Sequence, residues 1–364
     1  MRPKRILVIV RGHLGDLIMA LPALRDLRRA LPQAHITAFV NEYIRGALDN
    51  CPFVDDLIYG FTYKDKSLPA RLAYQTFNLA QIVGRYNIAL CLRISPRTAP
   101  LVALLSGARV RVGYNQPGIF GQLLTRNLGR EPNRTCNRTL HLNVVAALGG
   151  IQTNPTYPQI DWLSPQVRRE TAALLAANGI RPGTRFAVVQ LSCHWGCNEW
   201  QSEKWAALAD YMAAAHNLRV VACGTGEAHE WAKYHQVAGL MKHKLVSLLG
   251  QTSIPQFIEV IGRANLALAA DSALTQIALA QQTPSVILFG IEPIENNGPL
   301  PEEIGRLIEP IQHWEGPDKA PPPNPHCRFA DGHCHTEFCR ENSSMAQTSV
   351  KEVQERVKRL LGRS

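Results

Sequence analysis

The chain has 364 residues, 46% of them hydrophobic and 19% charged, so it can bury the cores of two domains and is not a disordered protein. Its formal net charge of +10 predicts an anionic partner, which composition leaves open as nucleic acid, a phospholipid surface or a phosphorylated substrate. No apolar run reaches the roughly 18 residues of a transmembrane helix, and the N-terminal run is too short for a signal peptide, so we expect a cytoplasmic protein.

The N-terminal half alternates short apolar runs with longer stretches of helical periodicity. We expect strands at 6–10, 35–40 and 88–92, with helices at 22–31 and 68–83 between them and a further helix at 99–105. A polar loop region at 115–139 interrupts this alternation, and a helix at 141–148 follows it. The alternation is typical of a parallel sheet with crossover helices.

The same alternation begins again after a proline-rich stretch at 153–165. We expect strands at 186–191, 219–223, 244–248, 266–269 and 285–289, with helices at 165–178, 203–215, 228–237, 254–263 and 274–281. Two doubly wound α/β halves in tandem place a cleft between the carboxyl edges of two sheets. We therefore predict a Rossmann-like domain at 1–155, a linker at 156–165, a second Rossmann-like domain at 166–345 and a C-terminal segment at 346–364 with a helix at 350–361.

One acidic residue stands at the first passage from strand to helix. In "ILVIVRGHLGDLIMALP", Gly12 and Gly15 are expected in the turn and Asp16 at or beside the start of the next helix. Asp is a preferred N-cap residue and complements the helix dipole, so capping is one interpretation. The other is that Asp16 faces the cleft as a general base. The turn is not a dinucleotide fingerprint, because the third glycine is missing.

Several ordered segments along the chain carry a family resemblance. They are "GDLIMALPALRDLRRALP", "CPFVDDLIYG", "RVRVGY", "NEWQSEKWAALADYM" and "LLGQTSIPQFIEVIGRANLALAADSALTQIALAQQTPSVILFG". In this order they resemble the signature segments of glycosyltransferase family 9, the bacterial lipopolysaccharide heptosyltransferases. The resemblance covers nearly the whole chain. It implies a GT-B architecture, in which an N-terminal acceptor domain and a C-terminal nucleotide-sugar domain, both Rossmann-like, face a central cleft.

The resemblance also implies an activity and its participants. It implies an inverting, metal-independent transferase that needs no cofactor and moves a heptose from a nucleotide-diphospho-sugar, ADP-heptose above all, to an anionic glycolipid such as the lipopolysaccharide core. The enzyme would then be peripheral on the cytoplasmic side of the inner membrane. Direct displacement needs a base on the acceptor hydroxyl and positive or dipolar groups on the departing diphosphate. Asp16 matches the family's proposed base, and the helix start at 272–276 would supply the dipole.

Three residues depart from the family pattern at the expected donor site. Asn198 stands where the family has a lysine, Ala273 where it has a glycine, and Gln276 where it has a histidine. Charge-assisted hydrogen bonds are about twice as strong as neutral ones, so these changes weaken the expected hold on a diphosphate. Either other groups bind the phosphates, with His194 and Lys204 as candidates, or the donor differs, or the chain is a catalytically degenerate homologue that binds a sugar or a partner.

Two acidic positions of the expected donor site have ordinary alternatives. Asp271 is either an N-cap or a contact to a sugar hydroxyl. Glu227 loosely matches the family acid at the nucleotide ribose, with Glu230 as the alternative, and a solvated first-turn acid accounts for either. The predicted donor-binding residues are Ser192, His194, Asn198, Glu227, Asp271, Ser272, Ala273 and Gln276.

Basic residues of the N-terminal half are predicted to bind the acceptor. For any one of them, a solvated surface charge is the ordinary alternative. The predicted acceptor-binding residues are Gly15, Lys64, Lys66, Arg71 and Arg111, with Arg93, Arg97 and Arg109 as further bases. No nucleic-acid-binding module is recognisable, so nucleic acid is not an expected partner.

The C-terminal stretch "PHCRFADGHCHTEFCRENSSM" raises a metal hypothesis. Cys327, Cys334 and Cys339, with neighbouring histidines, offer the thiolate and imidazole ligands of structural zinc, but no CxxC pair is present. We therefore predict no bound metal and keep these cysteines as a weak candidate. The chain has nine scattered cysteines, an odd number, which is typical of a reducing compartment.

Overall fold

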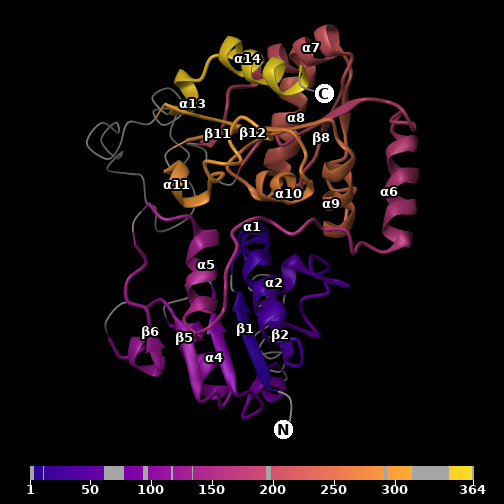
Figure 1. The fold of residues 1–364 in the computed structure, drawn as a ribbon. Coiled ribbons are helices and arrows are strands. Elements are labelled where there is room, and N and C mark those ends of the chain that lie inside the picture. Colours follow the sequence, from indigo (N-terminus) through magenta and orange to yellow (C-terminus); the bar gives the residue numbers. More distant parts are fainter. Residues whose placement is uncertain are drawn as a thin grey trace. The chain divides into compact units, whose positions relative to one another are not determined.

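A computed structural model describes residues 4–10, 12–60, 78–92, 97–115, 118–132, 134–193, 198–290, 293–313 and 344–362. The chain divides into two compact units, residues 1–162 and 163–364, and each is described by itself (Figure 1). No helix among the described residues is both long enough and apolar enough to cross a bilayer.

The N-terminal unit is built on a parallel six-stranded sheet with the order β3-β2-β1-β4-β5-β6. The strands are β1 (Arg5–Val10), β2 (His35–Asn41), β3 (Asp56–Gly60), β4 (Ile88–Cys91), β5 (Val110–Gly113) and β6 (Arg126–Asn127). The α-helices are α1 (Leu14–Met19), α2 (Leu21–Ala30), α4 (Thr98–Leu105) and α5 (Asn137–Ala146), and the 3-10 helices are η1 (Glu42–Ile44) and η2 (Gly121–Leu123). β1 is buried from Ile6 to Val10, because a central parallel strand is covered on both faces.

Helix α4 covers one face of this sheet. Its Ala99, Val102 and Ala103 share a core with Leu7 and Ile9 of β1. Helices α1, α2 and α5 contact one another and form a separate group. Since alternate side chains of a strand point to opposite faces, the remaining apolar residues of β1 face away from α4.

The C-terminal unit has a second parallel sheet with the order β12-β11-β10-β7-β8-β9. Its strands are β7 (Phe186–Val189), β8 (Arg219–Ala222), β9 (Leu245–Ser247), β10 (Leu266–Ala270), β11 (Ser285–Phe289) and β12 (Ile308–Gln312). Its helices are α6 (Pro165–Ala177), α7 (Ser202–His216), α8 (Ala228–Leu240), α9 (Ile254–Arg263), α10 (Ala273–Gln281), α11 (Ile294–Asn297), α13 (Ser344–Gln347) and α14 (Val350–Leu361). Figure 1 shows α14 beside α7, and α14 also contacts β11 and β12.

Both sheets have the doubly wound order of a Rossmann-like domain, which confirms the predicted fold class. The sequence did not predict α1 or the strands β3, β5, β6 and β12. These strands are short or carry charged residues, such as Arg111 in β5 and Glu309 in β12, so they lack the apolar runs by which the others were recognised. The expected helix at 68–83 lies mostly outside the described residues, and its part at 78–82 is helical. Helix α5 begins at Asn137, inside the expected loop region.

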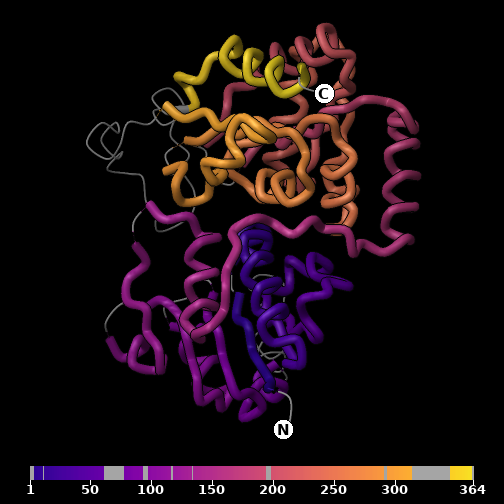
Figure 2. Tube along the Cα trace, viewed as in Figure 1, coloured from indigo at the N-terminus to yellow at the C-terminus, as the bar shows by residue number. Residues whose placement is uncertain are grey.

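The segment after α5 runs back along the N-terminal unit and is hydrogen-bonded to it (Figure 2). The buried Arg25 guanidinium donates to the carbonyls of Thr156, at 2.7 Å, and Asn154, at 2.6 Å. Its neighbour Asp26 accepts from the Asn154 N–H at 2.6 Å, and Arg25 Nε donates to Asp26 at 2.8 Å. The buried Arg138 donates to the Pro155 carbonyl. Residues 154–156, at the start of the proline-rich stretch, are thus held by buried polar groups.

Candidate functional site

The turn after β1 holds Asp16 in a defined geometry. His13 is the N-cap of α1, and Asp16 is the third helical residue rather than the N-cap. The His13 backbone N–H donates to Asp16 Oδ2 at 2.8 Å, which is the reach-back half of a capping box. Gly15 lies inside α1 and not in the turn. Asp16 therefore caps α1 from the third helical position and is not the N-cap that the sequence suggested, while its role as a base stays a prediction.

Gly12 brings the backbone against this carboxylate. A Cβ on Gly12 would lie 2.3 Å from Asp16 Oδ2, so any larger residue would displace the acid. The Gly12 carbonyl accepts from Asn41 Nδ2 at 2.9 Å and from the Tyr43 hydroxyl at 2.8 Å. The sequence interpretation missed Asn41 and Tyr43, although Asn41 ends β2 and Tyr43 follows it, at the carboxyl end where ligand-facing residues of parallel sheets gather.

On the C-terminal sheet, the passage from β10 to α10 holds Asp271 and Gln276 through one residue. Asn297 Nδ2 donates to Asp271 Oδ2 at 2.8 Å, and Gln276 Nε2 donates to the Asn297 carbonyl at 2.6 Å. Gln276 is only 2% exposed. Asn297 thus links Asp271, which precedes α10, to Gln276, which lies inside that helix. The sequence interpretation missed Asn297 because it belongs to α11, which follows β11 in the chain.

Ser272, and not Asp271, is the N-cap of α10. The Ser272 hydroxyl is buried and has no hydrogen-bond partner within the described part of the protein. Ala273 is the first residue of the helix. The first backbone N–H groups of a helix have no intrahelical acceptor, and together with the helix dipole they favour an anion.

Asn198 lies against the end of β11. It is buried, and a Cβ on Gly290, the residue after β11, would lie 1.8 Å from Asn198 Oδ1. Ser192, also buried, comes three residues after the end of β7. The carboxyl ends of β11, β10 and β7, which are consecutive in the sheet, thus bring together Asn198, Asp271 and Ser192 with the start of α10. The junction of β10 and β7 is the point where the strand order reverses, which is where open α/β sheets bind ligands.

The structure separates the two acids after β8. Glu230 is buried and accepts from the Thr225 hydroxyl at 2.8 Å and from the Gly226 N–H at 2.6 Å, so it closes the loop at the start of α8. Glu227 is the N-cap of α8, and its side chain is 68% exposed. The loop therefore uses Glu230 internally and presents Glu227 to solvent.

Two predicted cations bind the protein itself. Lys204 Nζ donates to the carbonyls of Ala346, at 2.6 Å, and Thr348, at 3.0 Å, so it anchors the segment before α14, and its expected role at phosphate is not what the structure shows. Burial lowers the pKa of this ammonium. The Arg111 guanidinium donates to the carbonyls of Leu123 and Ala108, and its acceptor role stays a prediction.

Other predicted residues lie outside the described residues. They are His194, Lys64, Lys66, Arg71, Arg93, Cys327, Cys334 and Cys339. Within the described ranges, no group of three or more His, Cys, Asp and Glu is placed to hold a metal ion. The metal hypothesis for the C-terminal cysteines therefore stays a prediction on sequence alone.

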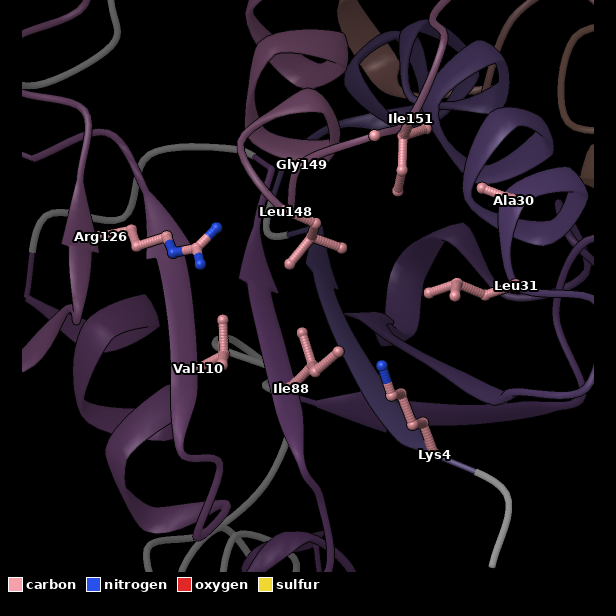
Figure 3. A pocket seen from close by; sticks show the side chains of 10 residues that line it. Lys4, Ala30, Leu31, Ile88, Val110, Arg126, Leu148, Gly149 and Ile151 are labelled. Atoms are coloured by element: carbon pink, nitrogen blue, oxygen red, sulfur yellow. The ribbon is translucent and has the colours of Figure 1, made fainter. Parts of the chain in front are cut away.

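A cavity of about 250 Å³ lies at the opposite, amino-terminal edge of the first sheet. Figure 3 shows Lys4 and Arg126 at its margin and the apolar side chains of Ile88, Val110 and Leu148 between them. It contains none of the predicted site residues. Because α/β ligand sites lie at carboxyl edges, we do not assign the predicted chemistry to it.

Comparison with known proteins identifies relatives over most of the chain. The sequence model of the family described as "Glycosyltransferase family 9 (heptosyltransferase)" matches residues 80–319, a range that begins after Asp16. Lipopolysaccharide heptosyltransferase 3 of Escherichia coli is 24% identical over 290 residues, which are 77% of this chain and 82% of that protein.

Two solved structures share the fold. A glycosyl transferase family 9 protein from Veillonella parvula DSM 2008 superposes with a TM-score of 0.78 at 19% identity, covering 99% of this chain and 98% of that one. The ADP-heptose lps heptosyltransferase II of E. coli superposes with a TM-score of 0.73 at 19% identity, covering 99% of both chains. These two likenesses concern the fold alone.

Proposed function

We propose, because the chain belongs to glycosyltransferase family 9, that this glycosyltransferase moves a heptose or related sugar from a nucleotide diphosphate, ADP-heptose in the first place, to a lipopolysaccharide core or similar anionic glycolipid. It acts with inversion, without a metal, as a cytoplasmic protein on the inner membrane surface. The observation that carries this proposal is the row of polar groups at the carboxyl ends of β11, β10 and β7, next to the start of α10.

The C-terminal unit binds the donor in this proposal. The diphosphate lies at the first turn of α10, where the helix N–H groups can donate to its oxygens, as can the Ser272 hydroxyl, which has no hydrogen-bond partner among the described residues. Asp271, oriented by Asn297, accepts from a sugar hydroxyl, and the exposed Glu227 accepts from the ribose. The helix dipole stabilises the charge that develops on the departing diphosphate, so this step needs no metal ion.

Asp16 is the base of the transfer. The acceptor oxygen attacks the anomeric carbon from the face opposite the diphosphate, the bond between that carbon and the diphosphate oxygen breaks, and the hydroxyl proton passes to Asp16. The His13 N–H at Asp16 Oδ2 fixes the orientation of the carboxylate before the acceptor binds. The capping bond is therefore compatible with catalysis.

Turnover of Asp16→Asn tests the base. Asparagine keeps an acceptor oxygen for the His13 N–H but cannot take a proton, so we expect kcat with ADP-heptose and a purified core acceptor to fall roughly 10²- to 10⁴-fold, with donor affinity by calorimetry unchanged. Asp49→Asn, an exposed carboxylate in the same unit, is the control and should keep full turnover. Full turnover by Asp16→Asn would show that Asp16 is not the base, without contradicting the proposed transferase activity.

Gln276 is a positioning residue for Asp271 rather than a phosphate ligand. Its amide donates to the Asn297 carbonyl, and a neutral hydrogen bond contributes about 1 kcal/mol. We expect Gln276→Ala to weaken donor binding roughly fivefold and to have much less effect when Asp271 is already Asn. Gln251→Ala removes an exposed glutamine that also donates to a backbone carbonyl and serves as the control. Equal losses in both backgrounds would contradict the link through Asn297.

A catalytically degenerate protein that binds a sugar or a partner is the second candidate. The neutral Asn198 and Gln276, both buried at the expected diphosphate site, favour it. Calorimetry of the wild type against ADP-heptose, other nucleotide-diphospho-sugars and ADP separates the candidates when combined with turnover. Donor binding without turnover on any core acceptor would support the degenerate protein. If the wild type shows no donor binding and no turnover, the proposal that it is a transferase fails.

A further inference from the structure

The charge of the chain is concentrated in one stretch. Residues 66–130 contain nine lysines and arginines and no aspartate or glutamate, whereas the remaining residues contain 30 basic and 29 acidic side chains, from totals of 39 and 29. The nine are Lys66, Arg71, Arg85, Arg93, Arg97, Arg109, Arg111, Arg126 and Arg130. This stretch therefore accounts for nearly all of the net charge of +10, and it has no carboxylate to repel an anionic surface.

Helix α4 lies in this stretch and is apolar on its outer side as well as its inner side. Its inner residues pack in the core of the N-terminal unit. On the outer side, Leu101, Leu104 and Leu105 follow the i, i+3, i+4 spacing of one helix face and are 42%, 40% and 38% exposed. A helix that is hydrophobic all round is normally buried, so this outer face lacks the cover that its composition predicts.

Other apolar and basic side chains extend this face. Val83 is exposed one residue before Gly84, whose N–H donates to the Leu105 carbonyl at 3.0 Å. Ile119 is exposed just before η2, which contacts α4. Of the eight large apolar side chains exposed among the described residues, five lie here. We call these five, with the exposed Arg85, Arg97 and Arg109, the α4 face: Val83, Leu101, Leu104, Leu105, Ile119, Arg85, Arg97 and Arg109.

We propose that the α4 face docks on the surface of a bilayer that contains anionic lipids. The leucines enter the boundary between headgroups and acyl chains, and the arginines bind lipid phosphates around them, which is the division of work in interfacial helices. Exposed leucines flanked by arginines suit a lipid surface better than a nucleic acid, for which an aromatic platform or a recognition module is expected. The proposal rests on the proposed function in one respect: a glycolipid acceptor lies in such a bilayer.

Vesicle flotation tests the docking surface. The full chain is mixed with vesicles of phosphatidylcholine alone and with vesicles that contain 30 mol% phosphatidylglycerol, at ~50 and ~150 mM salt, a range over which exposed charges are progressively screened. We expect binding to the anionic vesicles, stronger at the lower salt, and little binding to phosphatidylcholine. Absence of binding to anionic vesicles at both salt concentrations would overturn the proposal.

Two sets of substitutions test which face binds. We expect the triple variant Leu101→Gln, Leu104→Gln, Leu105→Gln, which keeps good helix formers, to bind about tenfold more weakly or less. We expect Arg85→Gln, Arg97→Gln, Arg109→Gln to lose roughly fivefold per arginine. The controls are on the other unit: one exposed leucine, Leu240→Gln, to be compared with Leu104→Gln alone, and Arg169→Gln, Arg181→Gln, Arg219→Gln to be compared with the triple arginine variant. Equal losses in controls and test variants would show that only overall charge or hydrophobicity matters and would overturn the assignment of the face.

A depth measurement separates a bilayer from a protein partner. We expect Leu104→Trp to add fluorescence that brominated lipids quench, whereas Leu240→Trp adds fluorescence that they do not. If light scattering instead shows a dimer that the triple leucine variant dissociates, and Leu104→Trp is not quenched, the face is an interface between copies and the proposal fails. Thermal melts of each variant confirm that the unit remains folded.

Turnover distinguishes this proposal from the proposed function. With a short, soluble acceptor, we expect the triple leucine variant to turn over like the wild type, while turnover on acceptor embedded in vesicles falls with binding. If the protein binds vesicles but shows no turnover, the docking surface is supported and the proposed transferase activity fails. If the triple leucine variant turns over both acceptors as fast as the wild type, the docking surface fails and the transferase activity is supported.

Discussion

The two units have the same strand order, but different forces hold the chain segment that returns onto each one. In the N-terminal unit, residues 154–156 are held by guanidinium and carboxylate groups of Arg25, Asp26 and Arg138. In the C-terminal unit, α14 returns through apolar packing of Val353, Val357 and Leu360, to which ion pairs such as Arg356–Glu309 are added. A shared topology therefore leaves open whether a unit is closed by polar groups or largely by apolar burial, and we expect different substitutions to open the two units.

Two buried thiols report on the units separately. Burial raises the pKa of the Cys91 thiol, in the N-terminal unit, and of the Cys223 thiol, in the C-terminal unit, to about 12. Neither forms the reactive thiolate near neutral pH while its unit is folded. Pulsed alkylation at pH 8 followed by mass spectrometry therefore measures how often each unit opens.

The largest expected effect is that of Arg25→Ala. It leaves the buried Asp26 without its cation, and breaking a buried pair costs about 3–5 kcal/mol. We expect Cys91 to be alkylated at least a hundredfold faster, with Cys223 unchanged. Arg29→Ala, which removes an exposed arginine from the same helix, is the control. Equal acceleration at both cysteines would mean that the two units open together.

Leu360→Ala should produce the opposite pattern. Leu360 is buried in the core of the C-terminal unit, and truncation of a buried leucine costs about 2–5 kcal/mol. We expect faster alkylation of Cys223 and no change at Cys91, with Glu355→Ala, an exposed residue of α14, as the control. An unchanged Cys223 would show that α14 can leave without opening the sheet beneath it.

Gly12→Ala and Gly290→Ala compare the two candidate half-sites. Each adds a Cβ against a site side chain, Asp16 in the first unit and Asn198 in the second, and overpacking of this kind typically costs 1–3 kcal/mol. We expect Gly12→Ala to lower kcat at unchanged donor affinity, and Gly290→Ala to weaken donor binding about tenfold. Gly239→Ala, whose Cβ would meet nothing within 4 Å, is the control. Loss of donor binding in Gly12→Ala would show that the donor does not bind the C-terminal unit alone, contrary to our proposal.

The smallest effect is a matched pH dependence. Burial would raise the pKa of Asp55, but the Ile36 N–H and Arg28 outweigh it and lower that pKa; in the same way the N–H groups of Lys242 and His243 lower the pKa of Asp210. A lowered carboxyl pKa contributes stability above its unfolded value, near 3.8, and loses it as pH falls through the lower folded value. We expect Asp55→Asn and Asp210→Asn each to cost under about 1 kcal/mol of unfolding free energy at pH 7, and we expect this cost to disappear as the pH falls through the lowered folded pKa of each carboxyl. A cost that does not decrease in acid would show that the charge is not its source.

Much of the fold could be predicted from the sequence, because buried parallel strands are continuous apolar runs. The strands β1, β2, β7, β10 and β11 follow this rule. Helices α9 and α14 have their predicted bounds, since Ser253 and Ser349 cap their starts. β12 was missed because Glu309 and Pro310 interrupt its apolar pattern, and the buried Glu309 pairs with Arg356 and Arg359 of α14.

The sequence by itself determined two doubly wound halves, with Asp16 near the start of the first helix and Asp271 directly after a strand, because periodicity and turn residues are local properties of the chain. Only the tertiary structure decided what each polar group contacts. It assigned Glu230 to a loop, Lys204 to the segment before α14, and Asn297 to a place between Asp271 and Gln276. Those contacts join residues from separate elements that meet only when strands pack in the sheet, and one-dimensional patterns carry no record of which side chains then come within hydrogen-bond distance.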